Sequence, residues 1–399
     1  MFAGLIDEYQ HLAQVVAVAE PRDAYRAGVA NRFNLDPSRV FTSWRDFADR
    51  PRMCDAVIVA TMDRDHVGPA VACLDKGYDL LLEKPMAVTL EDCRAIAAAQ
   101  RRSGAIAGVC HSMRYHKGYR RIKELLDTGA IGSIISIDQL EQVAYWHQAH
   151  SFVRGNWGNE GRATFMLMAK SCHDIDYIAY LVGRPCRAVS SFGALTHFKT
   201  ANAPAGSTAR CTDGCPVEPK CPYSAIRQYV FGNREQWPAS VVSHVHTRDA
   251  HLDAIRQGPY GRCVYRCDND VVDHQVVAME FEDDITATFT MTGMTQGCGR
   301  RVRIHGDKGD LHYDEEQSTI VIRTFLDNNV TTIAVAPEVG GHGGADARVL
   351  REWLEALHSR DDSAIVANAQ EALRTHTIVF AAEKARLEKR VIDVAGMQG

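Results

Sequence analysis

The first third of the chain alternates short apolar runs with segments whose apolar residues recur at helical spacing. Short runs without a polar face are typical of strands buried on both sides, as in a parallel sheet. Strands that alternate with helices predict βαβ units and a doubly wound, Rossmann-like sheet. Thr89 and Asp92 predict a capping box for the last helix. The predicted strands are 15–19, 55–61, 79–82 and 105–110, and the predicted helices are 2–12, 22–33, 66–76 and 89–102.

The pattern changes after about residue 112. Residues 131–141 and 271–291 alternate apolar and polar positions, which predicts antiparallel strands with one solvated face. Residues 119–128 and the closing segment 364–390 are predicted to be helical. We therefore predict two domains. The first is 1–114, and the second is an α+β domain over 115–399 with a Cys-rich insertion at about 197–223.

Composition narrows the class of protein. The chain has 399 residues, 46% of them hydrophobic and 24% charged, with a formal net charge of −5. This balance is typical of a globular protein and argues against nucleic acid as a partner. No apolar run approaches the ~20 residues of a membrane helix, and the N-terminus lacks the pattern of a signal peptide. Twelve scattered cysteines favour a reducing, cytoplasmic location.

A doubly wound sheet commonly binds a nucleotide at the carboxyl ends of its strands. Glu20 ends the first predicted strand, where an acid accepts hydrogen bonds from the adenosine ribose and favours NAD over NADP. The nearby Arg22 and Arg26 weaken this preference, so NADP stays an alternative. A surface acid at the end of a strand is the other interpretation of Glu20.

The glycine-rich loop expected before the first helix is absent, and so is the strand that precedes it. That strand normally lies in the middle of the sheet, and its loss leaves backbone groups without partners at ~1–3 kcal/mol each. We therefore expect either that the natural polypeptide begins upstream of Met1 or that this form binds the cofactor poorly.

Several motifs together resemble the glucose–fructose oxidoreductase/inositol dehydrogenase (Gfo/Idh/MocA) family. Glu83-Lys84-Pro85 closes a predicted buried strand, as the corresponding tripeptide does in that family. The other matching stretches are Ala60-Thr61 with His66, Arg114-Tyr115, Cys172-His173-Asp174-Ile175-Asp176 and the Gly-rich loop 341–346. The resemblance implies an NAD(P)-binding domain, a large mostly antiparallel sheet that also builds homo-oligomers, and oxidoreductase chemistry on sugars, inositols and related polyols.

Hydride transfer from a secondary alcohol needs a base for the hydroxyl proton and a cation to stabilise the developing alkoxide. The resemblance assigns the cation to Lys84 and the base to His173, whose imidazole type titrates near neutral pH. The family's Asp one helical turn before this histidine is replaced by Ala169, with Lys170 beside it. We therefore expect Lys84 and Lys170 to act as the polar pair.

The remaining candidate residues divide into two groups. The cofactor-binding candidates are Glu20, Ala60, Thr61, His66, Glu83, Lys84 and Arg114. Aromatic residues interleaved with polar ones suit a carbohydrate, because flat rings pack on C–H surfaces while polar groups bond hydroxyls. The substrate-binding candidates are therefore Tyr145, Trp146, His147, Arg154 and Trp157, together with His342.

Cys211, Cys215 and Cys221 lie within eleven residues of a Pro- and Gly-rich loop. Three thiolates so close suggest a tetrahedral zinc ion that needs one more ligand. His197 is the nearest candidate, and Cys263 and Cys267 are alternatives. An iron–sulfur centre and three reduced cysteines without a metal are the other interpretations.

The leading functional prediction is a dehydrogenase or reductase that uses NAD(P) and acts on a sugar, an inositol or a related polyol. One alternative is a redox-assisted glycosidase, in which the cofactor transiently oxidises a ring hydroxyl and permits elimination. A second is a non-catalytic regulator that binds the cofactor. Retained Lys84 and His173 favour an enzyme.

Overall fold

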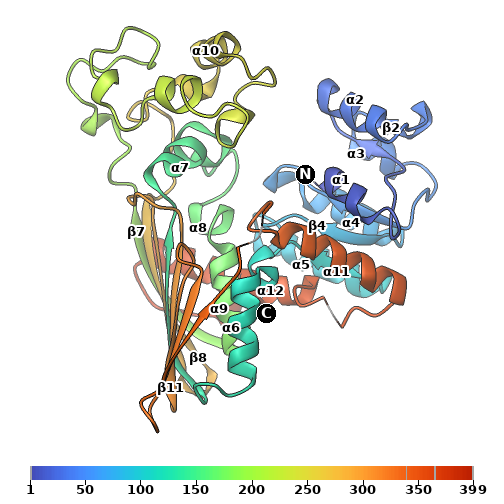
Figure 1. The fold of residues 1–399 in the computed structure, drawn as a ribbon. Coiled ribbons are helices and arrows are strands. Elements are labelled where there is room, and N and C mark those ends of the chain that lie inside the picture. Colours follow the sequence, from blue (N-terminus) through green and yellow to red (C-terminus); the bar gives the residue numbers. More distant parts are fainter. Residues whose placement is uncertain (1, 338, 364, 398–399) are drawn as a thin grey trace. The chain divides into compact units, whose positions relative to one another are not determined.

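The computed structural model describes residues 2–337, 339–363 and 365–397, and Figure 1 shows the order of their elements. The chain divides into two compact units. Unit 1 comprises Met1–Ala130, Ile175–Leu181 and Ala334–Phe380, and unit 2 comprises Ile131–Asp174, Val182–Ile333 and Ala381–Gly399. Unit 1 therefore takes a short segment from the middle of the chain and a longer one near its C-terminus in addition to the N-terminal segment.

Unit 1 is built on a parallel three-stranded sheet in the order β3-β4-β5, as the apolar runs predicted. The strands are β3 (Ala56–Val59), β4 (Asp79–Leu82) and β5 (Ala107–Val109). The first predicted strand is much shorter than expected. It forms only β1 (Val18–Ala19), which pairs in parallel with β2 (Val40–Phe41) in a separate two-stranded sheet.

Helices cover both faces of the three-stranded sheet. Alternate residues of β4 point to opposite faces and therefore pack against different helices. Leu80 and Leu82 pack in one apolar cluster with α4, α5 and α12, whereas Leu81 packs in another with α1 and α11. The helices of unit 1 are α1 (Phe2–Ile6), α2 (Asp23–Arg32), α3 (Trp44–Ala48), α4 (Val67–Asp75), α5 (Leu90–Ser103), α6 (Lys117–Asp127), α11 (Ala345–Ser359) and most of α12 (Ala369–Glu388).

The ends of α5 follow from its sequence. Thr89 Oγ1 accepts a hydrogen bond from the Asp92 N–H at 3.1 Å, which confirms the predicted N-cap. Gly104 ends the helix at a φ of 65°, a conformation that glycine adopts without steric cost. The closing helix was predicted over 364–390 and is found as α12, although residue 364 lies outside the described residues. Helix α11 was not predicted.

Unit 2 contains a nine-stranded sheet in the order β13-β12-β11-β10-β6-β9-β8-β7-β14. Strands β6 and β9 run parallel, whereas β6–β10, β7–β8, β8–β9, β10–β11 and β11–β12 pair antiparallel. Strand β8 alternates exposed and buried residues throughout, as its period-two pattern predicted. The strands are β6 (Ile134–Gln142), β7 (Cys186–Ala194), β8 (His274–Phe281), β9 (Thr286–Thr292), β10 (Gly299–Gly306), β11 (Gly309–Asp314), β12 (Thr319–Thr324), β13 (Val330–Ala334) and β14 (Ile392–Asp393).

The Cys-rich insertion lies between β7 and β8 and consists of short turns and one longer helix, α10 (Arg248–Gln257). Helices α7 (Tyr145–Ala149) and α8 (Met166–Ala169) also belong to unit 2, and α9 (Cys172–Val182) contributes residues to both units. No helix formed by the described residues combines the length and the apolar character that a membrane crossing requires.

Unit 1 contains a buried ion pair that ties α9 to the segment after β5. Arg114 donates to the Asp176 carboxylate through Nε at 2.7 Å and Nη2 at 2.8 Å, and burial of both groups is almost complete. The carboxylate also accepts from Thr375 Oγ1 at 2.8 Å. The pair therefore connects three chain segments of unit 1.

We expect Asp176→Ala to destabilise the protein by about 3–5 kcal/mol, because the substitution leaves the guanidinium buried without its counter-ion. Urea unfolding followed by circular dichroism measures the change. Asp253→Ala, which removes an exposed partner of Arg256, is the matched control and should leave the unfolding midpoint unchanged. Equal midpoints for the two variants would contradict the structural role of the buried pair.

Candidate functional site

The tripeptide Glu83-Lys84-Pro85 follows the carboxyl end of β4, and buried histidines fix the turn on both sides of Pro85. His66 precedes α4 with 1% of its surface exposed, and its ring lies 2.7 Å from the Pro85 carbonyl oxygen through Nδ1. Its Nε2 lies 3.1 Å from the Thr61 carbonyl oxygen. The ring therefore links the segments that follow β3 and β4. These contacts let His66 position the turn, and its predicted contact with the cofactor stays a prediction.

The second histidine is His376 of α12, which the sequence analysis missed. Its Nε2 accepts a hydrogen bond from the Met86 N–H at 3.0 Å, and its Nδ1 donates to the Ala372 carbonyl at 2.8 Å. Burial lowers the pKa of His376 to about 3, and the neighbouring His111 ring adds to this effect. The neutral His376 ring, with Nε2 as its acceptor, therefore holds the turn that follows Lys84.

Two carboxyl groups of unit 1 act electrostatically on the half-buried Lys84. Burial raises the pKa of Glu83 and the charge of Lys84 opposes this rise. Asp346 accepts a hydrogen bond from Ser112 Oγ at 2.7 Å and lies 2.9 Å from His342 Nδ1. Burial raises the pKa of Asp346, but His342, Ser112 and Lys84 more than offset it, so the pKa is lowered. The ring of His342, a predicted substrate contact, thus pairs with Asp346.

The residues at this edge of the sheet fit a polar ligand such as a dinucleotide. Thr61 Oγ1 is buried, yet it has no hydrogen-bond partner within the described part of the chain. An orphaned hydroxyl costs stability unless a ligand satisfies it. Ala60 and Thr61 follow β3 and Lys84 follows β4, so the predicted cofactor residues meet at the carboxyl ends of adjacent parallel strands.

Two predicted cofactor contacts have other partners in the structure. Glu20 accepts hydrogen bonds from the Arg22 side chain at 2.7 and 2.8 Å, and this pair lowers the pKa of Glu20. Arg114 uses Nε and Nη2 for Asp176 and Nη1 for the Val366 carbonyl. Asp176 and Val366 therefore hold the guanidinium in place, and the contact of Arg114 with the cofactor stays a prediction.

Unit 2 has its own buried polar network, centred on Glu141 of β6. Glu141 accepts from Ser171 Oγ at 2.8 Å and Arg300 Nη2 at 2.8 Å, and Lys170 Nζ lies 3.2 Å away. Burial alone raises the pKa of this carboxyl, but Arg300 and Lys170 reverse the effect and lower it. Lys170, predicted to be catalytic, is thus one of the cations that keep Glu141 ionised.

Asp174 is the second acid of this network. It accepts hydrogen bonds from Arg300 Nε at 2.7 Å and Gln139 Nε2 at 2.6 Å. Burial raises the pKa of Asp174, and the charge of Glu141 adds to this rise while Arg300 opposes it. The network therefore contains two acids and two cations.

His173, the predicted base, is 2% exposed at the start of α9. The motif places Ala169 and Lys170 about one helical turn before His173, whereas in the structure α8 ends at Ala169 and α9 begins at Cys172. Lys170 lies in the break between them, and its side chain turns toward Glu141. The role of His173 stays a prediction.

An aromatic cluster of unit 2 contains two of the predicted substrate contacts. The ring centroids of Trp146 and His147 lie 5.7 Å apart, and Trp237 lies 5.5 Å and 4.7 Å from them. Cys298 Sγ is 3.9 Å from His147 Nδ1, and the charges of Lys170 and Glu141 both act on this thiol. Trp237 was missed because it is remote in sequence. The cluster extends from the charged network into partly exposed surface.

The other predicted substrate contacts pack elsewhere in unit 2. Tyr145 contacts Tyr223, and Trp157 lies 6.2 Å from Phe152. Arg154 is 1% exposed and donates to the carbonyl oxygens of Arg262 at 2.8 Å and Tyr223 at 2.6 Å. These backbone groups of the insertion hold its guanidinium in the interior, and the contact of Arg154 with the substrate stays a prediction.

The predicted zinc site is not supported. His197 Nε2 lies 3.2 Å from the Tyr265 hydroxyl and does not line the pocket that contains Cys211, Cys215 and Cys221. The fourth cysteine of that pocket is Cys263. Among the described residues, no group of three or more His, Cys, Asp or Glu side chains is arranged to hold a metal ion.

Comparison with known proteins shows the family. A family model described as "Oxidoreductase family, NAD-binding Rossmann fold" matches residues 2–111, and one described as "Oxidoreductase family, C-terminal alpha/beta domain" matches residues 123–394. The chain therefore belongs to the Gfo/Idh/MocA family of oxidoreductases. Both the family and the Rossmann-type fold predicted from the sequence are confirmed.

Curated relatives match the chain at low sequence identity. YteT of Bacillus subtilis, named as an oxidoreductase, is 27% identical over 75% of this chain and 71% of its own length. Inositol 2-dehydrogenase 2 of Saccharopolyspora erythraea is 28% identical, over 43% of this chain and 47% of its own length. This second match therefore spans less than half of the relative.

Solved structures share the fold. An NAD-binding oxidoreductase from Klebsiella pneumoniae aligns with a TM-score of 0.69 and 14% identity, covering 96% of this chain and 90% of that one. A levoglucosan dehydrogenase in complex with NADH aligns with a TM-score of 0.68 and 17% identity over the same shares.

The buried histidines of unit 1 predict acid sensitivity. The pKa of His376 is lowered to about 3 and that of His111 to about 4, so the folded protein binds fewer protons than the unfolded chain between these values and about 6.5. We therefore expect the contribution of these two histidines to the free energy of unfolding to fall as the pH decreases from about 6.5 to 4. His376→Gln, which keeps an acceptor but does not titrate, should show a smaller pH dependence in urea unfolding. An unchanged slope would contradict this assignment.

Proposed function

We propose that the protein is an NAD-dependent dehydrogenase, with NADP as the alternative cofactor, that oxidises a secondary hydroxyl of a sugar, inositol or related polyol. The observation that carries this proposal is Lys84, anchored at the carboxyl end of β4 in a Rossmann-type domain of an oxidoreductase family. Relatives named inositol 2-dehydrogenase and scyllo-inositol 2-dehydrogenase support the substrate class. A homo-oligomer and a cytoplasmic location stay predictions.

In the proposed reaction, the hydride, the hydroxyl oxygen and the hydroxyl proton each interact with a different group. A bound nicotinamide supplies the acceptor for the hydride that leaves the carbinol carbon. Lys84 donates a hydrogen bond to the hydroxyl oxygen and stabilises the negative charge that develops on it. His173 receives the hydroxyl proton. Glu83 and Asp346 balance the charge of Lys84 before the alkoxide develops.

Unit 2 supplies groups suited to a polyol. The rings of Trp146 and Trp237 offer flat apolar faces for C–H surfaces, and Lys170 and Arg300 offer N–H donors beside Glu141. Because the cations of this network are already paired with acids, the network suits the neutral hydroxyl groups of a polyol better than a strongly charged substrate.

A second candidate function is elimination or hydration without net redox change. One relative is named 2,7-anhydro-N-acetylneuraminate hydratase and is 25% identical over 45% of this chain. Product analysis separates the two functions, because a dehydrogenase accumulates NADH with a free sugar whereas redox-assisted elimination leaves the NAD pool unchanged.

The proposal is tested by NADH formation with a panel of sugars and inositols. We expect Lys84→Met to lower kcat by about 10²–10³-fold, the usual cost of losing one donor to a developing oxyanion. His173→Asn should cost about 10²–10⁴-fold. Lys123→Met, which changes a lysine paired with Asp127 on α6, is the matched control and should retain full kcat.

The outcomes separate catalysis from binding. Tight NAD binding with no turnover on the panel by the unmodified protein would contradict the enzymatic proposal and favour a regulator. Full kcat in Lys84→Met would instead overturn the role given to Lys84.

The aromatic cluster yields a prediction on substrate affinity. We expect Trp237→Ala to raise KM by about tenfold with little change in kcat, because the indole contributes about 1.4 kcal/mol of packing to the ground state and the transition state alike. Phe231→Ala is the matched control, since Phe231 is also exposed on the insertion but packs under Arg248. Equal KM values for the two variants would remove Trp237 from the substrate site.

A further inference from the structure

Unit 2 contains a second pocket, between the Cys-rich insertion and residues 154–162, that the proposed dehydrogenase chemistry does not use. Its volume is about 440 Å³, within the range of small-molecule sites. Four of the nine lining residues are arginines, Arg154, Arg162, Arg210 and Arg262, and the lining residues in the described part of the chain include no Asp or Glu. The guanidinium of Arg154 is held by backbone carbonyls in the interior, so the other three arginines give the pocket its charged surface.

Backbone hydrogen bonds hold two of these arginines side by side. The Cys263 N–H donates to the Ala209 carbonyl at 2.8 Å, which joins two loops about fifty residues apart in sequence. The same loops form an antiparallel bridge in which Arg210 lies opposite Arg262. Two like charges are therefore fixed next to each other by the backbone, an arrangement that is favourable only with a compensating anion nearby.

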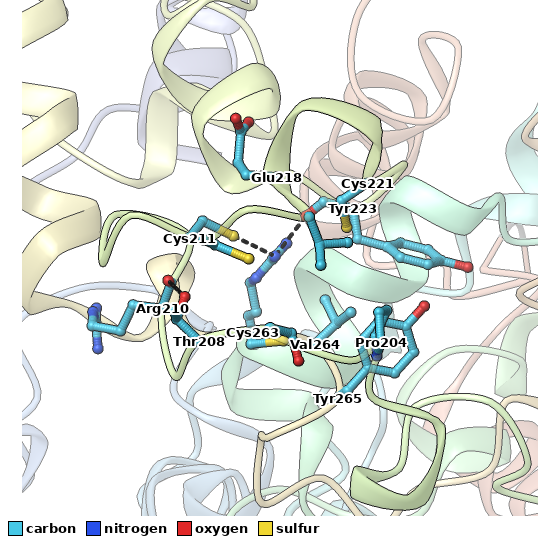
Figure 2. A pocket seen from close by; sticks show the side chains of 14 residues that line it. Pro204, Thr208, Arg210, Cys211, Glu218, Cys221, Tyr223, Cys263, Val264 and Tyr265 are labelled. Atoms are coloured by element: carbon cyan, nitrogen blue, oxygen red, sulfur yellow. Dashed lines mark hydrogen bonds between the residues drawn. The ribbon is translucent and has the colours of Figure 1, made fainter.

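Arg210 has no carboxylate partner. Its Nη2 donates to the carbonyl of Ile255 at 2.8 Å and to that of Gly258, at the C-terminal end of α10. These bonds fix the side chain but do not neutralise it, and no described carboxylate forms an ion pair with it. Its Nε is buried and has no hydrogen-bond partner within the described ranges. Figure 2, which shows the neighbouring cysteine pocket, shows the Arg210 side chain pointing away from the Cys211 sulfur.

Arg162 and Arg262 share a single carboxylate. Asp268 Oδ1 accepts from Arg262 Nη1 at 2.7 Å and from Arg162 Nη2 at 3.3 Å, and Asp268 Oδ2 accepts from Arg162 Nη1. The side chains of Arg162 and Arg262 are 43% and 27% exposed, so a ligand from solvent can reach them. With Arg210, three cations face one acid, which leaves a surplus of two positive charges.

The pocket is separate from the aromatic cluster of the proposed substrate site. Tyr260, in the turn after α10, stacks on His150 with ring centroids 4.7 Å apart and an interplanar angle of 8°. The His150 ring lies 5.4 Å from that of Trp237. None of the described rings of the cluster, Trp146, His147 and Trp237, lines the pocket. The pocket is therefore a second ligand site of unit 2.

The surplus charge matches a dianion. A phosphate monoester carries about −1.5 to −2 charges at pH 7, whereas a carboxylate carries only one. Guanidinium groups bind phosphate oxygens through parallel N–H donors. The pocket is larger than a phosphate group alone, so it leaves room for an organic group. Asn156 and Gln257 also line it, and amide side chains both donate to and accept from hydroxyl groups.

We propose that this pocket binds a small phosphate monoester, such as a sugar phosphate, with its phosphate group between Arg162, Arg210 and Arg262. The ligand binds reversibly and without a covalent step. The site lies outside the proposed substrate contacts and does not depend on the proposed function.

The test is isothermal titration calorimetry on the full chain at low ionic strength and without NAD. The probes are glucose 6-phosphate, inorganic phosphate, glucuronate and glucose. We expect glucose 6-phosphate to bind most tightly, inorganic phosphate and glucuronate to bind about tenfold more weakly, and glucose not to bind.

Each other outcome contradicts part of the proposal. No saturable binding of glucose 6-phosphate would overturn the site. An equal Kd for glucuronate, which keeps the ring but carries one charge, would overturn the preference for a dianion. An equal Kd for inorganic phosphate would overturn the preference for an ester. Because no turnover is measured, these failures leave the proposed function unaffected.

Variants test the three arginines. We expect Arg162→Gln and Arg210→Gln each to raise the Kd for glucose 6-phosphate by about 10–100-fold, the usual cost of losing a hydrogen bond to a charged group. Arg256→Gln is the matched control and should leave the Kd unchanged, because Arg256 is an exposed arginine of α10 that pairs with Asp253 and does not line the pocket.

Arg210 also holds the end of α10, so circular dichroism checks the fold of its variant. Arg162 lies at the exposed rim, and its variant tests the site even if Arg210→Gln does not fold. An unchanged Kd in Arg162→Gln, or an equal loss of affinity in Arg256→Gln, would overturn the assignment.

Discussion

The position of Lys84 depends on how the turn around Pro85 is held. The ring of His66 lies against the Pro85 carbonyl, and His376 accepts from the Met86 N–H. These histidines come from segments more than three hundred residues apart, yet both reach one turn after β4. Each buries a polar ring, which is favourable only while its hydrogen bonds are intact. The position of Lys84 therefore depends on the packing of α12 on the sheet.

The parts of the fold that the sequence predicted are those governed by local pattern. The apolar runs predicted β3, β4 and β5, and Thr89 predicted the start of α5. Family motifs then identified Lys84 and His66. The family motif did not show that Asp176 binds the guanidinium of Arg114, because the two residues lie sixty-two positions apart in the sequence.

Contacts made by tertiary packing could not be predicted. Arg154 fitted a carbohydrate motif by residue type, but its guanidinium turns inward to backbone carbonyls of the insertion. Trp237 joins the aromatic cluster from a segment without any motif. His197 was chosen as a metal ligand because it was the nearest histidine in sequence, whereas the backbone bonds between two loops bring Cys263 to the pocket. Proximity in sequence was therefore the wrong criterion for His197, and it gave no signal for Trp237.

The charge balance of unit 2 restricts the ligands that can approach its network. Glu141 is paired with Lys170 and Arg300, and Arg300 also holds Asp174. An anionic ligand would compete with buried carboxylates for the same cations, and a cationic ligand would have to displace the lysine or the arginine. A neutral hydroxyl both donates and accepts, so it can join the network without separating any pair. Lys170 lies beside Ala169, the residue in place of the family motif's Asp, and it pairs with Glu141, so that two cations balance the two acids of this network.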